Sequence, residues 1–364
     1  MHYNPDNLFH YIIKTGADWL FRVKTVPSVL IKSGLLLIVV SFGGWKFIGI
    51  ETAFLKINFS DAATPETILW AVFLLGGISF IAGVLLSIMS YVSENTRKKT
   101  IVIEKRGLKF SPDTRLKDSA GKIRSGKLEV IDCDIRQRMN NGVIDQPEEA
   151  LSRITNLQTE LEAKCNNVNS DDLKIIYGGL MAVPFTFLTG ILIDDENDLI
   201  QVFDWDRHAK KWRELNGSDD QERFDITGLE DVSGKEEAIL VVSASYKVDF
   251  ETVKATLGTL PVVHMELPNG GTNCHWSKNK QTELCRSFTD TLVKLKSLGL
   301  KNLHLFVAAP NSLCFNLGRH YDNRNFPHAK IYQYEQSINP PYPCSLVLPT
   351  HGKKVEIIRS TKLP

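Results

Sequence analysis

The order of apolar and polar residues divides the chain into an N-terminal part with two long apolar runs and a longer part with short ones. The longest run, residues 67–93, contains no charged residue. A helix needs about 20 apolar residues to cross a bilayer, so this run is long enough to span one. Trp70 and Tyr91 lie near its ends, as interfacial aromatic residues often do. The alternative, a core helix of a soluble domain, is disfavoured because such helices rarely run so far without a charge.

The other apolar run, residues 28–50, contains Lys32 and Lys46. It can span a bilayer if the two side chains extend to opposite interfaces. A signal peptide is the alternative, but the charged lead-in is long and no small-x-small cleavage site follows clearly. We therefore expect a transmembrane hairpin within residues 1–100, with spans at about 28–50 and 67–93.

Small residues share one face of the second predicted span, and they are Gly76, Ser79, Gly83, Ser87 and Ser90. Small side chains allow helices to approach closely within a bilayer. This face predicts a packing seam against either the first span or other copies of the chain. No ionisable residue interrupts the span, which argues against a charged ion pathway within it.

Lysine and arginine residues precede the first span and follow the second, where Arg97, Lys98 and Lys99 are consecutive. The positive-inside rule therefore places both termini in the cytoplasm. The six cysteines form no C-x-x-C pair, so neither a zinc finger nor a disulfide framework is expected. A formal net charge of +1 argues against binding to nucleic acid polymers.

After residue 100, apolar stretches of strand length alternate with helical ones. We expect a connector over 101–144, a domain over 145–350 with halves at about 145–235 and 236–350, and a tail over 351–364. The predicted strands are residues 101–103, 128–131, 173–177, 199–205, 238–242, 261–267, 303–308 and 330–334. The predicted helices are residues 147–161, 181–193, 250–257, 282–298 and 312–319, with a turn at 178–179 and a loop over 216–235. This alternation predicts an α/β domain with a mainly parallel sheet.

In open parallel sheets, ligands bind beyond the carboxyl ends of the strands, near helix N-termini. Three predicted strand ends carry suitable residues, which are Gly178 and Gly179, then Ser243, Ser245 and Tyr246, then Pro310, Asn311 and Ser312. A helix that begins near Asn311 has free N–H groups that suit a phosphate. Lys247, Arg319 and Arg324 are candidate counter-charges. Each strand end also has a simpler explanation, as a tight turn or an ordinary helix cap.

Catalytic signatures are missing from the sequence, which has no nucleophile elbow, P-loop, dinucleotide-binding glycine motif or zinc-protease motif. His264 and His304 lie within predicted strands, so we expect core histidines rather than bases. His275, His320 and His328 occupy no recognisable constellation. We therefore predict no catalytic residue and no metal ligand, and we expect a binding domain rather than an enzyme.

Two groups of motifs resemble the SAVED domain family and follow one another in that family's order. The first group is residues 177–190 (YGGLMAVPFTFLTG), 202–205 (VFDW) and Trp212. The second group is residues 303–310 (LHLFVAAP), Phe315, 317–318 (LG) and 331–335 (IYQYE). The resemblance covers about residues 145–350 and leaves the predicted hairpin outside it.

The resemblance implies two fused Rossmann-like halves, similar to CARF domains, behind two N-terminal transmembrane helices. It implies that the domain binds a cyclic di- or trinucleotide made by a partner nucleotidyltransferase in CBASS anti-phage defence. Ligand-driven homo-oligomerisation would then cluster the membrane helices, disrupt the bacterial inner membrane and cause abortive infection, without any cofactor. The alternatives are a membrane-anchored nucleotide-processing enzyme, such as a ring nuclease, and a structural anchor that recruits a partner.

Together with the strand ends, the resemblance gives a set of candidate ligand-binding residues in the family's loops. They are Gly178, Gly179, Pro184, Ser243, Ser245, Tyr246, Pro310, Asn311, Ser312 and Gly318. Tyr246 and Trp276 are the candidates for stacking on a base.

Overall fold

The computed structural model describes residues 25–42, 51–52, 55–56, 66–108, 112–121, 126–136, 139–140, 143–166, 168–194, 200–350 and 354–359. The chain folds as two compact units, Met1–Thr96 and Arg97–Pro364.

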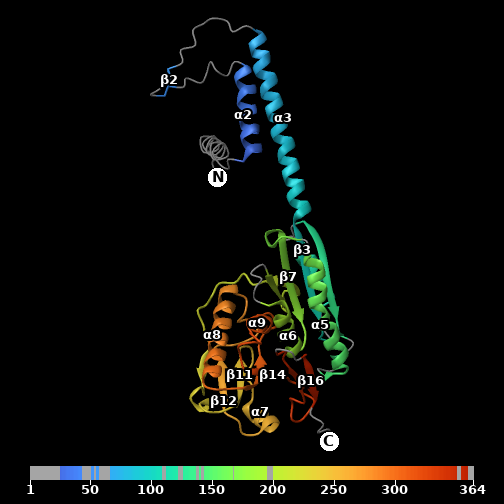
Figure 1. The fold of residues 1–364 in the computed structure, drawn as a ribbon, viewed down its shortest axis with the longest axis vertical. Helices are drawn as coiled ribbons and strands as arrows, with labels where there is room; N and C mark the ends of the chain where they lie inside the picture. Colours follow the sequence, from blue (N-terminus) through green and yellow to red (C-terminus); the bar gives the residue numbers. More distant parts are fainter. Residues whose placement is uncertain are drawn as a thin grey trace, which may run out of the picture. The chain divides into compact units, whose positions relative to one another are not determined.

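The first unit contains the helices α2 (Val26–Ser41) and α3 (Glu66–Arg97), which lie side by side (Figure 1). Among the described residues, α3 is the helix that is long and apolar enough to cross a membrane. The first predicted span coincides with α2 as far as Ser41, and residues 43–50 lie outside the described part. A hairpin of β1 (Glu51–Thr52) and β2 (Leu55–Lys56) lies between the two helices in the sequence.

Glycines bring α2 and α3 into close backbone contact. A Cβ atom added to Gly76 would lie 2.9 Å from the carbonyl oxygen of Gly34, and one added to Gly83 would lie 2.8 Å from the backbone of Ile31. Between these glycines, the Ser79 hydroxyl donates a hydrogen bond of 3.1 Å to the carbonyl of Leu30. The N-terminal part of the predicted seam therefore packs against α2 of the same chain.

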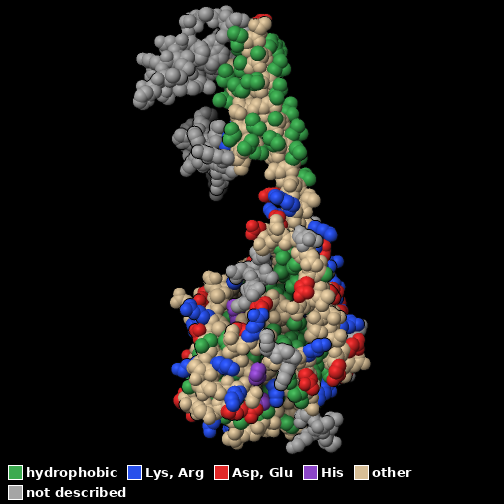
Figure 2. All heavy atoms as spheres, in the orientation of Figure 1, with side chains coloured by type: hydrophobic (Ala, Val, Ile, Leu, Met, Phe, Trp, Pro, Cys, Tyr) green, Lys and Arg blue, Asp and Glu red, His purple; other side chains and the backbone are tan. Residues whose placement is uncertain are grey.

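The side of α3 that faces away from α2 is apolar and exposed (Figure 2). Its large exposed side chains include Ile68, Trp70, Leu74, Leu75, Ile78, Ile81, Leu85 and Leu86. Ser87 and Ser90 of the predicted seam are exposed as well. An apolar exposed surface on a helix of this length is typical of a lipid-facing segment.

The second unit begins with a five-stranded sheet in which four strands are parallel and the last is antiparallel. In sheet order the strands are β4 (Lys127–Asp134), β3 (Lys99–Arg106), β7 (Leu173–Leu180), β8 (Ile200–Asp206) and β9 (Lys211–Glu214). Its helices are α4 (Leu116–Ala120), α5 (Pro147–Cys165) and α6 (Val183–Ile193), with a short η3 (Ser170–Asp172). The hairpin β5 (Met139–Asn140) and β6 (Val143–Ile144) precedes α5.

The expected connector over residues 101–144 supplies two strands of this sheet instead. Ile101, Val102 and Ile103 of β3 are fully buried, because β3 pairs with β4 on one side and with β7 on the other. The predicted turn at Gly178 and Gly179 is also different, since β7 continues through both residues to Leu180. Short β-branched runs were recognised as strands, but their place in the sheet depends on partners distant in the sequence.

A seven-stranded sheet follows, with four parallel strands flanked by antiparallel ones. In sheet order the strands are β10 (Asp225–Thr227), β12 (Val262–Glu266), β11 (Glu237–Ser243), β13 (Asn302–Ala308), β14 (His328–Gln333), β15 (Cys344–Val347) and β16 (Glu356–Arg359). Its helices are α7 (Phe250–Leu257), α8 (Lys278–Ser297) and α9 (Asn311–Arg319), with a short η4 (Glu230–Val232). Strand β10 lies in the predicted loop and β16 in the predicted tail.

The two sheets repeat one topology. Numbered along the chain, the parallel strands of each follow the order 2-1-3-4, as β4-β3-β7-β8 and as β12-β11-β13-β14. In both sheets an antiparallel strand, β9 or β15, then extends the edge beside the fourth strand. This is a doubly wound order, and it confirms the prediction of two Rossmann-like halves.

Helices α6 and α9, one from each half, join the halves through reciprocal glycine contacts. A Cβ atom on Gly190 of α6 would overlap the carbonyl oxygen of Phe315, and one on Gly318 of α9 would overlap that of Phe187. The largest apolar core continues across this contact and includes Ile154 of α5, Phe187 of α6, Leu240 of β11, Phe288 of α8 and Leu313 of α9. The halves therefore share one interior.

Candidate functional site

A cavity of about 110 Å³ lies where the carboxyl ends of strands from both halves meet. Strands β7 and β8 of the first half and β11 and β13 of the second end at it. Its lining residues are Leu180, Asp204, Trp205, Arg207, His208, Ser245, Tyr246, Thr272, Asn273, His275, Trp276, Ala309, Pro310 and Asn311. This is the edge at which doubly wound sheets bind ligands.

Asp204 of β8 is the buried carboxylate of this cavity, and it connects the two halves. Its Oδ2 accepts a hydrogen bond of 2.9 Å from the backbone N–H of Ser312 and lies 3.3 Å from Nε2 of His275. The start of α9, which we predicted as a phosphate site, is thus occupied by a carboxylate of the chain itself. The favourable interaction of an anion with a helix N-terminus explains why Asp204 tolerates burial there.

His275 is the buried imidazole of the cavity. Neither of its ring nitrogens makes a hydrogen bond of good geometry with the described residues. Burial lowers the pKa of His275, although the nearby Asp204 carboxylate acts in the opposite direction. The imidazole is therefore neutral at neutral pH.

The aromatic residues of the cavity differ in how much of their surface is available. The indole of Trp276 has the guanidinium of Arg213 at 4.7 Å from its ring centroid and the imidazole of His275 at 4.3 Å between centroids. By contrast, Tyr246 is 63% exposed and has no ring partner among the described residues. Of the two predicted stacking residues, Tyr246 is therefore the one with the more accessible ring.

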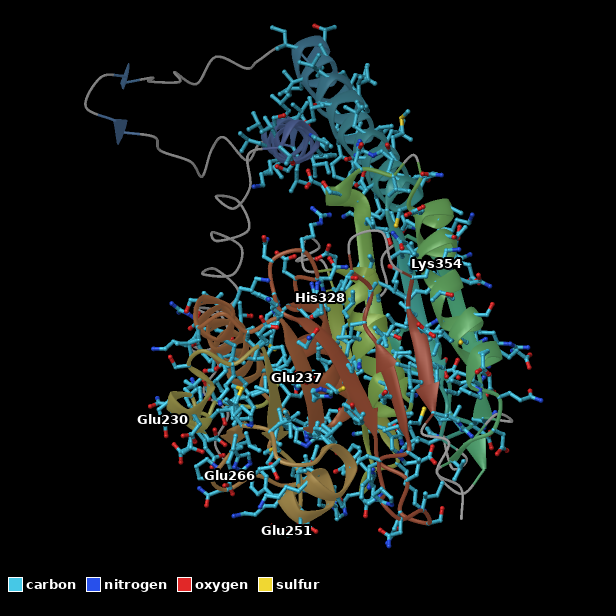
Figure 3. The ribbon with its side chains drawn as sticks, turned by 60° about the horizontal axis from the view of Figure 1, so that its bottom comes forward. Glu230, Glu237, Glu251, Glu266, His328 and Lys354 are labelled. Carbon is cyan, nitrogen blue, oxygen red and sulfur yellow. The ribbon has the colours of Figure 1, made fainter. Side chains whose placement is uncertain are left out.

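The positive charge at the mouth of the cavity comes from Arg207 and not from the predicted counter-charges. Lys247 forms an ion pair of 2.6 Å with Glu266. Arg319 donates to the carbonyl of Asp194 and lines a different cavity, and Arg324 lines neither. Figure 3 shows Glu266 at the carboxyl end of β12.

Four of the ten candidate ligand-binding residues line the cavity, and they are Ser245, Tyr246, Pro310 and Asn311. The side-chain oxygen of Asn311 also accepts hydrogen bonds from the backbone N–H of Met181 at 3.1 Å and from the hydroxyl of Thr186 at 3.2 Å. Asn311 therefore connects the start of α9 to the start of α6.

The other six candidates do not line the cavity, because each is buried and packs or forms hydrogen bonds in the interior of the domain. Ser243 is buried and contacts Nε2 of His264 at 3.0 Å, and the hydroxyl of Ser312 accepts a hydrogen bond of 2.9 Å from Gln281. Pro184 is buried in the first turn of α6. The remaining three are the packing glycines Gly178, Gly179 and Gly318.

Sequence reasoning missed Asp204, Arg207 and His275 as cavity residues. Asp204 belonged to the quoted motif 202–205, and its position at the end of a strand was a usable signal. His275 comes from the irregular segment between β12 and α8, for which no periodicity exists. The predicted core histidine His304 is confirmed as such, with hydrogen bonds of 2.7 Å to Tyr332 and 2.8 Å to Glu237.

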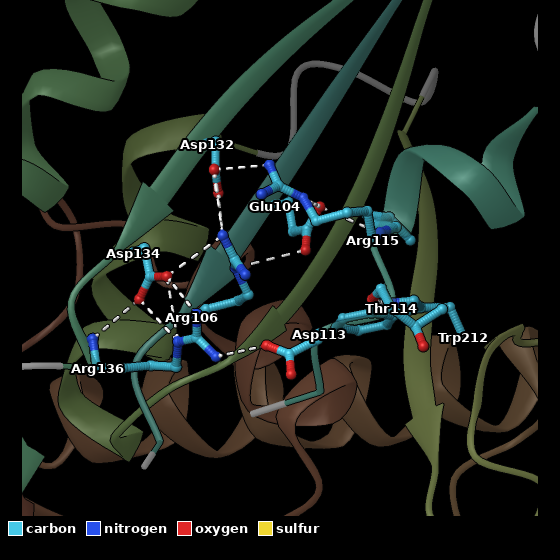
Figure 4. A network of polar contacts seen from close by, with 10 residues as sticks. Glu104, Arg106, Asp113, Thr114, Arg115, Asp132, Asp134, Arg136 and Trp212 are labelled. Atoms are coloured by element: carbon cyan, nitrogen blue, oxygen red, sulfur yellow. Dashed lines mark hydrogen bonds and ion pairs between the residues drawn. The ribbon is translucent and has the colours of Figure 1, made fainter. Parts of the chain in front are cut away.

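The carboxyl ends of β3 and β4 carry a network of ion pairs (Figure 4). Its members are Glu104, Arg106, Asp113, Arg115, Asp132, Asp134 and Arg136. Burial raises the pKa of Glu104, whose Oε2 accepts hydrogen bonds from Arg115 and from the backbone N–H of Leu116. Because these charges pair with one another, the network holds Asp113 and Arg115, which precede α4, against the sheet.

A larger cavity of about 330 Å³ lies elsewhere, between the amino end of β8 and helices α8 and α9. Its polar side chains include Gln281, which already bonds His275, Ser312 and Asn316. The smaller cavity is our candidate site, because it lies at the carboxyl ends of strands from both halves.

Two family models match the chain. Residues 157–348 match the profile of the SMODS-associated and fused to various effectors sensor domain, SAVED. The chain belongs to the SAVED family. Residues 6–151 match the SAVED-fused 2TM effector domain, so this SAVED protein carries a two-helix membrane effector in front of its sensor.

Solved structures similar to this SAVED protein include two Cap4 SAVED/CARF-domain receptors. One, from Acinetobacter baumannii with the cyclic trinucleotide 2'3'3'-cAAA, is 12% identical, with 94% of this chain and 85% of that chain covered and a TM-score of 0.46. The other, from Moraxella osloensis, is 12% identical, with 75% and 58% covered and a TM-score of 0.45. No curated protein matches the chain.

The family boundary does not coincide with a boundary in the fold. Strands β3 and β4 lie within the matched effector segment, yet β3 pairs along its whole length with β7 of the matched sensor segment. The two segments therefore share one sheet, and only Lys98 separates helix α3 from strand β3.

Proposed function

We propose that this SAVED protein is a membrane effector of CBASS anti-phage defence and that its cavity binds a cyclic di- or trinucleotide. The observation that carries the proposal is the cavity at the shared carboxyl edge, with the exposed ring of Tyr246 and the cation of Arg207 at its mouth. An aromatic face and a guanidinium are the groups that bind a base and a phosphodiester. Membership of a sensor family supports the same reading.

The size of the cavity indicates how such a ligand would bind. A volume of about 110 Å³ encloses only part of a cyclic oligonucleotide, such as one base. The rest of the ring would lie across the exposed residues at the mouth, Arg207, His208 and Tyr246. A ligand that extends beyond one chain in this way would also offer a surface to a second copy, which supports ligand-driven oligomerisation.

The membrane part of the proposal rests on α3 and on the effector segment. With the basic residues after α3 on the cytoplasmic side, the sensor would lie in the cytoplasm beneath the bacterial inner membrane. Assembly of sensors would cluster the helix pairs, and the exposed apolar face of α3 would then disrupt the bilayer and cause abortive infection.

Calorimetry with a panel of cyclic di- and trinucleotides tests the proposal, using the full chain in detergent. We expect one ligand of the panel to bind, and linear dinucleotides of the same bases to bind far more weakly. Recovery of the ligand unchanged after incubation separates a receptor from a ring nuclease. Absence of binding by every cyclic nucleotide would contradict the proposal.

A further inference from the structure

A cluster of three lysines lies at the amino ends of the first sheet, beside the point where the chain leaves α3. Lys99 begins β3, Lys127 begins β4, and Lys164 lies in the last turn of α5. Their ammonium groups surround one carboxylate, Glu129, at 2.9, 3.0 and 3.1 Å. These contacts lower the pKa of Glu129 to about 2, so it stays ionised at any physiological pH.

The cluster carries more positive charge than its internal partners neutralise. Three ammonium groups around one carboxylate leave two positive charges, and Lys127 is 73% exposed. Lys99 and Lys127 also lie directly opposite each other in adjacent strands. Two like charges in such a pair destabilise the sheet. A fold that needed only to neutralise Glu129 would need one lysine there.

The position of the cluster, directly after α3 in the chain, places it close to the end of the proposed membrane span. Only Lys98 lies between the last residue of α3, Arg97, and Lys99, so the two Cα atoms on either side are at most about 8 Å apart. Lys127 is in the neighbouring strand, about 5 Å further away. If α3 crosses a bilayer, the three lysines lie within reach of the phosphate layer at its end.

We propose that Lys127 and Lys164, held together with the mostly buried Lys99, form a binding surface for the headgroups of anionic phospholipids in the leaflet where α3 ends. This inference rests on the proposed membrane insertion of α3. Anionic headgroups supply the negative charge that the cluster lacks, and their binding holds the amino edge of the first sheet against the bilayer. A soluble phosphate offers the same chemistry, and the experiment separates the two sources.

The test uses the full chain reconstituted into vesicles of phosphatidylcholine alone or with equal parts of phosphatidylglycerol. The rate at which an amine-reactive reagent modifies Lys127 and Lys164 is followed by mass spectrometry, with the exposed Lys254 of α7 as the internal control. We expect modification of the two cluster lysines to be about fivefold slower in the anionic vesicles and to recover at high salt, with Lys254 unaffected. Equal rates in both vesicles would overturn the inference.

Two further arms complete the design. Neutral vesicles with added glycerol phosphate should not slow the modification, and equal protection by this soluble anion would also overturn the inference. Anionic lipid should slow the hydrogen exchange of the β4 amides in the native chain. It should slow this exchange less in the double variant Lys127→Gln/Lys164→Gln. A chain that is washed from the vesicles at alkaline pH has not inserted, and in that case the proposed function fails together with the inference.

Discussion

Single residues at the cavity show which sequence signals identify a ligand site. Ser245 and Tyr246 could be predicted because they lie just beyond the carboxyl end of a buried strand, after Ala244. The prediction that Ser312 lies at a helix start is confirmed. Its backbone N–H, however, donates a hydrogen bond to the carboxylate of Asp204, which comes from the other half of the domain. Competition of this kind depends on tertiary contacts, which no local pattern reveals.

Removal of the Tyr246 ring should weaken ligand binding without affecting the fold. Because this ring is exposed at the cavity and has no ring partner in the described part of the chain, Tyr246→Ala should lower affinity about tenfold or more. Tyr334→Ala is the matched control, since Tyr334 is also about half exposed but does not line the cavity. Equal affinities of the two variants in calorimetry would exclude Tyr246 as a contact.

His275 should make the fold sensitive to mild acid. Its pKa is lowered in the folded chain, so below its unfolded value of about 6.5 the unfolded chain binds a proton that the folded chain resists. Stability from this residue is therefore present at neutral pH and declines as the pH falls. The melting temperature should drop less between neutral and mildly acidic pH in His275→Gln than in the native chain. An identical drop in both proteins would refute this role.

The elements of the fold were predicted better than their connections. The helix over 250–257 is confirmed at both ends, and the four predicted strands of the second sheet lie within one or two residues of β11, β12, β13 and β14, because their apolar periods are regular. The sequence predicts strands near residues 101 and 128, and both are confirmed as β3 and β4. It does not predict that they belong to the same sheet as β7. The apolar run at 28–50 forms a helix only to Ser41 within the described residues.

Contact between α6 and α9 should depend on the absence of a side chain at Gly318. A methyl group there would overlap the carbonyl oxygen of Phe187, so Gly318→Ala should reduce the free energy of unfolding by about 3 kcal/mol. Gly271→Ala is the control, because a Cβ atom at Gly271 has no neighbour within 4 Å. Denaturant unfolding that shows equal stability for both variants would mean that the helices separate at little cost.

The membrane hairpin offers a similar comparison within α3. Leucine at Gly83 would collide with Ile31 and Pro27 of α2, whereas a Cβ atom at Gly77 of the same helix meets nothing within 4 Å. We expect Gly83→Leu to abolish ligand-triggered dye release from vesicles while ligand binding is retained, and Gly77→Leu to release dye normally. If both variants behave alike, close packing of α2 on α3 is not required for the membrane step.

At the scale of the whole molecule, the membrane helix α3 runs into the sensor sheet almost without a linker. Strand β3 is paired on both sides within the first sheet and follows α3 after a single intervening residue, Lys98. It extends about 25 Å toward the carboxyl edge of the strands. The layout of two membrane helices followed by two Rossmann-like halves was predictable from periodicity and motifs. The shared sheet was not, because it requires pairing between β3 and β7, far apart in the sequence.

Dye release from sealed vesicles that carry the full chain tests the central claim most directly. A panel of cyclic and linear oligonucleotides is added outside, where the reconstituted sensor faces the solution. The account predicts rapid release with the one cyclic oligonucleotide that binds, none with the linear forms, and release from vesicles that carry Tyr246→Ala only at about tenfold higher ligand concentration or more. Release that is independent of any nucleotide, or tight binding of a cyclic nucleotide without release, would contradict it.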